Sequence, residues 1–230
     1  MKTIGLIGGM SWESTQGYYR AINEGIKQRL GGLHSAQIAM YSVDFQPIET
    51  LQHDGDWDGT AVILADAAQR IAAAGADCLL ICTNTMHKVA PQVEAAVDIP
   101  LLHIADATAK VLLDKNIAKV GLLGTGFTME QDFYKGRLSE KFGLEVITPN
   151  REDRAIVHRV IYEELCLGKI EQQSKADYLR IIALLAEQGA EAVILGCTEI
   201  GLLVKQDDTG VPLVDTTMIH AQAAVDFALE

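Results

Sequence analysis

Two short segments of this sequence carry the residue types that proton transfer requires. Thr83-Asn84-Thr85 and Cys197-Thr198-Glu199 each follow an apolar run and place polar side chains directly after it. A cysteine thiol has a reference pKa of about 8.5, and this pKa falls beside a positive charge or at a helix N-terminus. Because a helix is expected to start at residues 198–199, we expect its dipole to favour the thiolate of Cys197.

The two segments occupy equivalent places in an internal repeat. Residues 75–81 match residues 189–195 with a shift of 114, and the same shift places Thr83 opposite Cys197. Residues 4–8 match residues 120–124, and residues 100–102 match residues 212–214, with shifts of 116 and 112. Three matches in the same order with a nearly constant shift predict two similar domains.

An opposed pair of proton-transfer groups is suited to inverting a carbon centre. Parallel sheets place their ligand-binding groups at the carboxyl ends of their strands, where both segments are expected. If the two domains face each other across a cleft, Thr83 and Cys197 project into it from opposite sides. One group can then remove a proton from one face of a carbon while the other returns a proton to the opposite face.

The elements that must position these residues follow an alternating order of strands and helices. Strands are expected near residues 3–8, 36–43, 77–83, 101–104, 120–124, 144–147, 192–196 and 212–215. Helices are expected near residues 14–30, 57–74, 85–96, 129–142, 153–167 and 173–188, and from residue 217 to the end. Strands that are apolar on both faces and alternate with helices predict an α/β fold with parallel sheets. We expect an N-terminal domain over residues 1–103, joined by the helix of about residues 217–230, and a C-terminal domain over residues 104–216.

Composition limits the partners and the compartment. The 230 residues carry a formal net charge of −12, which repels nucleic acid and anionic lipid, so we expect neither a nucleic-acid nor a membrane partner. The sequence shows no signal peptide and no apolar run of transmembrane length. The four cysteines are therefore expected to be reduced in the cytoplasm, and their spacing fits no zinc site.

Three segments resemble the motifs of the aspartate/glutamate racemase family: Gly8-Gly9-Met10-Ser11, Thr83-Asn84-Thr85-Met86-His87 and Gly196-Cys197-Thr198-Glu199. The resemblance covers essentially the whole chain. It implies two pseudo-symmetric Rossmann-like domains with an interdomain active-site cleft, and a cytoplasmic homodimer that needs no pyridoxal phosphate or other cofactor. It also implies racemisation of an amino acid by proton transfer between Cys197 and Thr83.

The first motif departs from the family pattern, which has a cysteine where this chain has Thr83. In this respect the chain is most similar to the subgroup specific for L-aspartate and L-glutamate. Cys82 lies one residue earlier, and adjacent strand residues point to opposite faces. We therefore read Cys82 as a core residue, with a local bend that brings it into the site as the alternative. Because threonine is a much weaker acid than cysteine, we expect one enantiomer, the L form, to react faster than the other.

The remaining candidates have structural readings beside their functional ones. Asn84, Thr85, Thr198 and Glu199 are expected to bind the substrate's carboxylate and ammonium groups, and they could also serve only as helix caps.

Met10 is expected to line the substrate. The resemblance implies that the loop of Gln52 also touches it, although the loop alone would read as an ordinary polar loop in which His53 could equally face solvent. The glycines near Met10 permit a tight turn but lack the third glycine of a dinucleotide fingerprint. His87 is either a core residue or a group that supports Thr83 without contacting the substrate. His103 is interpreted as structural.

Other assignments fit the same residues. A single reactive thiol also suits the malonate decarboxylases and maleate isomerases of the same superfamily. A broad-specificity racemase is another alternative, and it would not need a site for the acidic side chain of a substrate. No arginine stands beside the motifs, although Lys88 and Lys169 could supply positive potential. A two-domain ligand-binding protein without catalysis is the alternative outside enzymes, and the preferred side chain stays open.

Overall fold

The strands of this protein form two separate parallel sheets. A computed structural model describes all 230 residues. The first sheet has the order β2-β1-β3, and the second has the order β5-β4-β6-β7. The strands are β1 (Ile4–Gly8), β2 (Ile38–Ser42), β3 (Cys78–Ile81), β4 (Lys119–Gly124), β5 (Glu145–Ile147), β6 (Ala192–Gly196) and β7 (Leu213–Asp215). All neighbouring strands run parallel, so the expected α/β class with two parallel sheets is confirmed.

The chain forms two compact units, each built around one sheet. One unit comprises Met1–Ile104 and His220–Glu230, and the other comprises Ala105–Ile219. The chain therefore leaves the first unit once and returns to it within the last helix.

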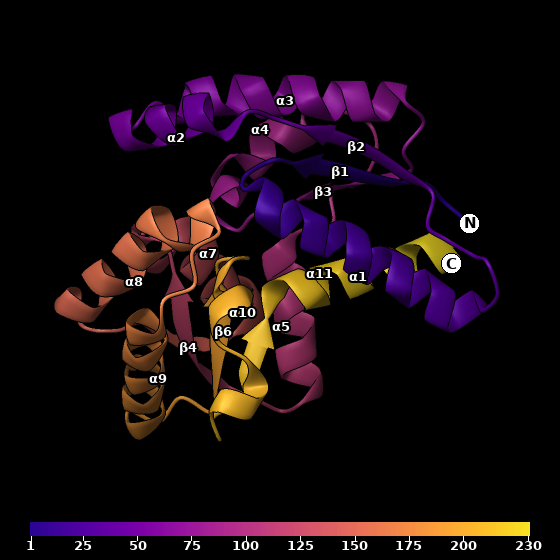
Figure 1. The fold of residues 1–230 in the computed structure, drawn as a ribbon. Coiled ribbons are helices and arrows are strands. Elements are labelled where there is room, and N and C mark those ends of the chain that lie inside the picture. Colours follow the sequence, from indigo (N-terminus) through magenta and orange to yellow (C-terminus); the bar gives the residue numbers. More distant parts are fainter. The chain divides into compact units, whose positions relative to one another are not determined.

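Helices cover the sheet of the first unit on both faces (Figure 1). They are α1 (Trp12–Leu30), α2 (Phe45–Asp54), α3 (Trp57–Ala73) and α4 (Ala90–Glu94), with a 3-10 turn η1 (Thr85–Val89) and the end of α11 (Thr216–Leu229). One apolar cluster packs α2, α3 and α4 on one face, and it includes Ile7, Leu64 and Ile81. A second cluster packs α1 and α11 on the other face, and it includes Leu6 and Leu80.

The sheet of the second unit packs its main apolar cluster against α8 and α9. Its helices are α5 (Ile104–Asp114), α6 (Gly126–Glu130), α7 (Asp132–Gly136), α8 (Arg151–Glu163), α9 (Gln172–Glu187) and α10 (Ile200–Leu203), with short turns at η2 (Arg137–Lys141), η3 (Leu165–Leu167) and η4 (Gln206–Asp208). The cluster joins Leu123, Val160, Ile182 and Val193. Residues of β4 and β6 are buried on both faces, as the continuous apolar runs of central parallel strands require.

The internal repeat predicted from sequence is confirmed in the strand register. Ile4 of β1 pairs with Cys78 of β3, and Val120 of β4 pairs with Ala192 of β6. These pairs are related by the same shifts, 116 and 114, that the sequence match gave. Thr83 and Cys197 therefore hold equivalent positions, each two residues beyond an equivalent strand residue of its own sheet.

Several predicted elements differ from the structure. The chain before and after Gln52 was expected to be a loop, but it is the helix α2. The predicted strand at residues 101–104 is reduced to one bridge between Leu79 and Leu101, and α5 was not predicted. The single helix predicted over residues 129–142 is instead the three short helical segments α6, α7 and η2.

Candidate functional site

The first motif follows β3 and is largely buried. Thr83 is half-buried, whereas the exposed fractions of Asn84 and Thr85 are only 1% and 5%. Cys82 is fully buried in the apolar cluster beside Tyr18, and burial raises the pKa of its thiol. This confirms the reading of Cys82 as a core residue, because its side chain packs under α1 and α11.

His87 fixes the backbone of Thr83. Its Nδ1 lies 2.8 Å from the Thr83 carbonyl oxygen, and the N–H of Ile104 donates to its Nε2 at 3.2 Å. Since a carbonyl oxygen only accepts, Nδ1 carries the proton and Nε2 is the acceptor, which defines a neutral imidazole. His87 is therefore a buried group beside Thr83, and it ties that segment to Ile104, where the first stretch of this unit ends.

Two further histidine rings lie close to the ring of His87. The ring of His103 lies 4.5 Å from that of His87, and the ring of His220 lies 5.8 Å from it, centroid to centroid. His220 donates from Nε2 to the Leu102 carbonyl at 2.6 Å and accepts from the Tyr18 hydroxyl at 2.9 Å. Burial lowers the pKa of His220 to about 4. Sequence reasoning missed His220, because 202 residues separate it from Tyr18 and no local pattern marks the contact.

The second motif forms a small hydrogen-bonded group after β6. The Cys197 thiol donates to Glu199 Oε2 at 3.0 Å, and the Thr198 hydroxyl donates to the same oxygen at 2.7 Å. The exposed fractions are 8%, 6% and 2% for Cys197, Thr198 and Glu199. The carboxylate thus accepts both neighbouring hydrogens, and the thiol points at a group able to take its proton.

The expected helix-dipole effect on Cys197 is wrong in this structure. Helix α10 begins only at Ile200 and has four residues. Burial and the charge of Glu199 raise the pKa of the Cys197 thiol well above its usual value. The resting group is therefore a protonated thiol.

The other candidates of the first unit lie at the carboxyl end of its sheet. Met10, whose exposed fraction is 2%, follows β1. Gly9, which lies between the end of β1 and Met10, has a φ of +97°. A side chain at this position would overlap the Val43 carbonyl oxygen, so only glycine fits. Gln52 is buried in α2 and donates from Nε2 to Met86 Sδ at 2.8 Å. The structure therefore brings Gln52 to the turn that follows Thr83.

The charged candidates have other contacts. His53 is exposed and pairs with Glu49 at 3.0 Å, which supports its reading as a solvent-facing side chain. The Lys88 ammonium lies 4.0 Å from the centre of the Trp57 ring, and partial burial lowers its pKa. Lys169 is exposed.

The sequence and the fold match proteins of one racemase family along nearly the whole chain. The family model described as Asp/Glu/Hydantoin racemase matches residues 7–224. The crystal structure of a candidate Asp/Glu racemase from Yersinia pestis is 59% identical, covers 100% of both chains and superposes with a TM-score of 0.92. An aspartate racemase homologue from Pyrococcus horikoshii OT3 is 38% identical, also over 100% of both chains, with a TM-score of 0.85. The broad-specificity amino-acid racemase RacX of Bacillus subtilis (strain 168) is 23% identical over 96% of both chains.

Proposed function

Because this chain belongs to the Asp/Glu/Hydantoin racemase family and is an amino-acid racemase, we propose that it racemises L-aspartate and L-glutamate without a cofactor, using Cys197 and Thr83. The observation that carries the proposal is the contact between the Cys197 thiol and Glu199. This contact gives a buried sulfur an immediate proton acceptor at the end of a central strand.

The proposed reaction starts at Cys197. Glu199 accepts the thiol proton and releases it to solvent, and the thiolate then removes the Cα proton of the bound amino acid, which restores the thiol. The electron pair of the broken C–H bond is left on Cα and delocalises into the substrate's carboxylate. The Thr83 hydroxyl donates a proton to the opposite face of Cα, and a proton from solvent restores the threonine.

Buried polar groups around the two reactive residues are proposed to hold the substrate. Asn84 and Thr85 follow Thr83, and Thr198 and Glu199 follow Cys197, so each strand end offers hydroxyl, amide or carboxylate groups. Met10 and Gln52 complete the first half of the proposed site. The substrate's ammonium would pair with carboxylate and hydroxyl oxygens, and its α-carboxylate with hydroxyl and backbone N–H donors.

Thr83 makes the proposed reaction unequal in its two directions. A thiolate is a much better base than a threonine hydroxyl at neutral pH, so abstraction from the face that Cys197 meets is fast. Abstraction from the other face requires Thr83 to act as a base and is slow. We therefore propose L-aspartate and L-glutamate as the preferred substrates.

A panel of L- and D-amino acids in heavy water, without added cofactor, tests the proposal. We expect α-deuterium, read by NMR, to enter L-aspartate and L-glutamate faster than their D forms. Equal rates for the two enantiomers would contradict the assigned roles. Release of CO2 from substituted malonates, without exchange into amino acids, would instead favour a decarboxylase.

Two variants separate the roles of the reactive residues. We expect Cys197→Ser to lower α-deuterium incorporation by about 10²–10⁴-fold, since a positioned base contributes that much. We expect Thr83→Val, which keeps the shape but removes the hydroxyl, to retain deuterium incorporation into the L-substrate and lose formation of the D-product. Loss of both readouts in Thr83→Val would show that Thr83 is not the second proton donor.

Broad specificity is the second candidate. The Bacillus subtilis relative RacX is described as a broad-specificity amino-acid racemase. No arginine lies beside either motif in the sequence. In the same heavy-water panel, exchange into neutral amino acids at rates equal to those of aspartate and glutamate would favour this candidate.

We also propose that the protein acts as a homodimer in the cytoplasm. All four cysteines are free, which suits a reducing compartment. No helix in the structure has the length and apolar character needed to cross a bilayer. Cell fractionation and the mass of the native protein test these two assignments.

A further inference from the structure

His220 on α11 joins segments of the first unit that are far apart in the sequence. Its Nδ1 lies 2.9 Å from the Tyr18 hydroxyl of α1, and its Nε2 lies 2.6 Å from the Leu102 carbonyl oxygen. A carbonyl oxygen only accepts, so Nε2 carries the proton and Nδ1 accepts from Tyr18. Tyr18 and His220 are fully buried, so water does not reach either side chain. His220 therefore ties the last helix to α1 and to residues 100–104, which follow α4.

The same segment also contacts the Thr83 motif. The N–H of Leu102 donates to the Leu79 carbonyl of β3 at 2.9 Å, which holds the segment beside this strand. The N–H of Ile104 donates to Nε2 of His87, and His87 in turn donates from Nδ1 to the Thr83 carbonyl. Because Leu102 and Ile104 are two residues apart, a shift of one displaces the other. The position of Leu102 therefore affects the bond that holds Thr83.

These hydrogen bonds form one directed path from α1 to Thr83. The donors are, in order, the Tyr18 hydroxyl, Nε2 of His220, the backbone N–H of Ile104 and Nδ1 of His87. Each histidine uses one ring nitrogen as donor and the other as acceptor, and the two histidines are in opposite tautomers. Buried polar groups that are bonded in this way stabilise one arrangement of the chain, because a displaced member loses its partner.

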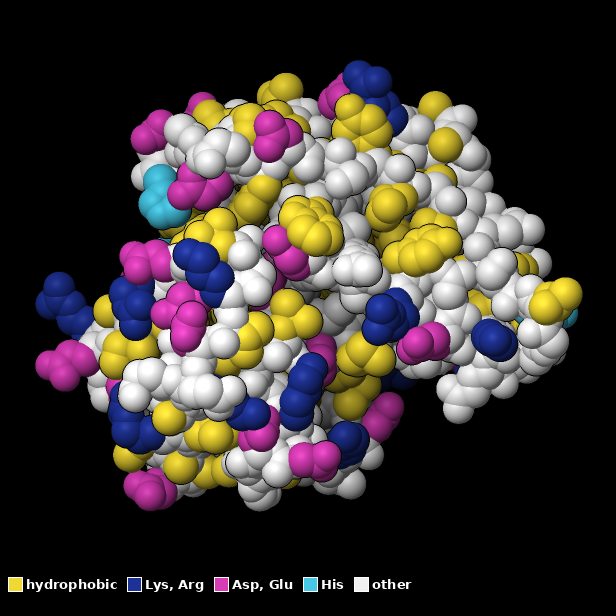
Figure 2. All heavy atoms as spheres, in the orientation of Figure 1, with side chains coloured by type: hydrophobic (Ala, Val, Ile, Leu, Met, Phe, Trp, Pro, Cys, Tyr) yellow, Lys and Arg dark blue, Asp and Glu magenta, His cyan; other side chains and the backbone are white.

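The histidines of this network are buried. Burial lowers the pKa of His220 to about 4, so at neutral pH its ring keeps one donor and one acceptor. The rings of His87 and His103 are 4.5 Å apart, centroid to centroid, and both side chains are buried. Histidine side chains make up very little of the surface visible in Figure 2. The proposed reaction transfers no proton through these side chains.

Thr83 lies where the strand no longer fixes the chain. Strand β3 ends at Ile81, and the N–H of Cys82 makes one more bond, to the Ile7 carbonyl at 2.9 Å. The Thr83 carbonyl is held by a side chain instead, through Nδ1 of His87. A displacement of about 1 Å in a reacting group can lower a rate about 10²-fold. The bond from His87 therefore affects how well the Thr83 hydroxyl meets a substrate.

We propose that His220 and Tyr18 are positioning residues for Thr83. They hold residues 102–104, this segment holds His87, and His87 orients the Thr83 backbone so that the hydroxyl faces Cα of the substrate. The proposal rests on the proposed function, in which Thr83 returns the proton to Cα. It predicts that damage to the network slows this return specifically.

Two rates separate positioning of Thr83 from an effect on the whole site. In the proposed reaction, α-deuterium incorporation into L-glutamate in heavy water requires Cys197, which follows a strand of the other sheet, whereas formation of the D-product also requires Thr83. A network that positions Thr83 should therefore affect the second rate and spare the first. A residue that only stabilises the fold would lower both rates together through loss of folded protein.

Two substitutions of His220 divide its hydrogen bonds. Asparagine places its amide oxygen near the position of Nδ1 and keeps the bond from Tyr18, but it loses the bond to Leu102. Glutamine places its amide nitrogen near the position of Nε2 and keeps the Leu102 bond. We expect His220→Asn to lower D-product formation about tenfold, the effect of one lost hydrogen bond, with little change in α-deuterium incorporation. We expect His220→Gln to retain most of both rates.

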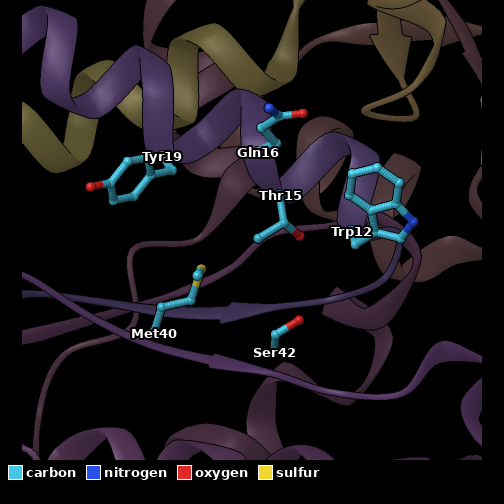
Figure 3. Close-up of a pocket in the computed structure, with 6 residues that line it drawn as sticks. All are labelled: Trp12, Thr15, Gln16, Tyr19, Met40 and Ser42. Atoms are coloured by element: carbon cyan, nitrogen blue, oxygen red, sulfur yellow. The ribbon is translucent and has the colours of Figure 1, made fainter.

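Tyr18→Phe is a second variant, since it removes only one hydroxyl at the start of the path. It should lower D-product formation in the same way but by less, because the bond to Leu102 remains. Tyr19→Phe is its matched control. Tyr19 is the next residue of α1, but it is 53% exposed and lines an open groove of about 330 Å³ with Met40 and Ser42 (Figure 3). This control should change neither rate.

Leu64→Ala controls for loss of stability, because it removes packing from the same unit in a cluster that contains no residue of the network. It should leave the ratio of the two rates unchanged. Equal loss of both rates in His220→Asn would overturn the proposal and leave the proposed function intact. Retained D-product formation in Thr83→Val would instead overturn the proposed function, and this proposal with it.

NMR of the imidazole nitrogens tests the network without any measurement of activity. Long-range proton–nitrogen spectra of the full chain should show His87 protonated at Nδ1 and His220 protonated at Nε2. In His220→Asn the Nδ1 resonance of His87 should shift, whereas in Tyr19→Phe it should stay. The same tautomer for both histidines, or a His87 resonance that does not respond to His220→Asn, would overturn the proposal.

Discussion

Cys197 is a protonated thiol that donates a hydrogen bond to the Glu199 carboxylate. This contact makes the thiolate less stable, but it also provides a group that can accept the thiol proton. The nearby charge of Glu199 and burial both disfavour the thiolate, so the pKa of Cys197 is raised. In the proposed reaction the same carboxylate, which already accepts the thiol hydrogen bond, takes the proton. Activity is therefore expected to rise with pH, since the thiolate forms as pH approaches the raised pKa.

Glu199→Gln separates the two effects of Glu199. Removing the negative charge takes away one cause of the raised pKa, so we expect the pKa of Cys197 to fall and alkylation by iodoacetamide to begin at lower pH. Racemisation should nevertheless decrease, because an amide does not accept the thiol proton. Alkylation of Cys197 followed by mass spectrometry measures the first effect, and α-deuterium exchange measures the second.

Glu163→Gln is the control, since its side chain is 68% exposed on α8. It should change neither readout. If the pKa of Cys197 in Glu199→Gln stays where it is in the wild type, the charge of Glu199 is not what raises it.

His87 offers a second prediction at this scale. Asparagine places its amide near the position of Nδ1, and glutamine places its amide near that of Nε2. We expect His87→Asn to keep the hydrogen bond to the Thr83 carbonyl and most of the turnover rate. We expect His87→Gln to lose that bond and to lower kcat by about tenfold, the effect of one lost hydrogen bond of about 1.4 kcal/mol.

The comparison is made with KM and thermal melting recorded for both variants. Equal kcat in the two, with equal loss of melting temperature, would show that His87 only stabilises the fold. The sequence indicated His87 through its place in the motif, but the direction of its hydrogen bonds came only from the structure. The hydrogen bond between the Cys197 thiol and Glu199 was likewise not predicted. The sequence indicated Cys197 for proton transfer and Glu199 for substrate binding, and it gave no sign that the two side chains contact each other.

At the scale of elements, strands were predicted best where they are buried on both faces. Strand β6 has the predicted bounds, residues 192–196. Helix α3 differs from prediction by one residue at its C-terminal end, and α9 differs by one residue at each end. Their continuous apolar runs or regular helical periods leave little ambiguity. Helix α2 was missed because only Ile48 and Gln52 of its ten residues are buried, so it has a weak apolar pattern.

Failures elsewhere have similar local causes. The segment after Thr83 was predicted as one helix, but Pro91 lies at its centre and it divides into η1 and α4. Residues 126–141 contain Gly126 and Gly136, and they divide into three short segments. Apolar periodicity does not report such breaks, because the apolar residues keep facing the core.

Helix α3 depends on its N-terminal cap. The N–H of Gly59 donates to Asp56 Oδ1 at 2.8 Å. We expect Asp56→Ala to lower the free energy of unfolding by about 1 kcal/mol, because a backbone donor loses its partner. Equilibrium unfolding in urea measures this, with Asp58→Ala as the control in the same turn. A larger loss in the control would mean that charge near the helix end, rather than the cap, stabilises α3.

At the scale of the whole molecule, the repeat and the parallel class were predictable because equivalent residues recur with shifts of 112–116. The place of β2 at the edge of the first sheet was not, since a sequence does not show which strand is terminal. The first unit has its own buried clusters on both faces of its sheet, and the second unit packs its own cluster beside α8 and α9.

A substitution that removes packing from one cluster should therefore destabilise the unit that contains this cluster before it destabilises the other unit. Leu64 is fully buried in the cluster beside α3, and we expect Leu64→Ala to cost about 2–5 kcal/mol through lost contacts and a cavity. Hydrogen exchange should show faster amide exchange in β1 and β3, with smaller changes in β4 and β6. Leu113→Ala, at an exposed position, is the control. Equal acceleration in both sheets would mean that the units unfold together.

The last helix gives the route of the chain a consequence for synthesis. Ala221, Ala224 and Val225 of α11 belong to the same apolar cluster as Ile4 and Leu6, which are synthesised much earlier. Strand β1 therefore leaves the ribosome long before α11, which covers it, has been made. Residues 105–219, by contrast, contain every strand of their own sheet before the end of α11 is synthesised. The second unit is therefore expected to fold first on the nascent chain, and the first unit can complete its core only after α11 has been synthesised.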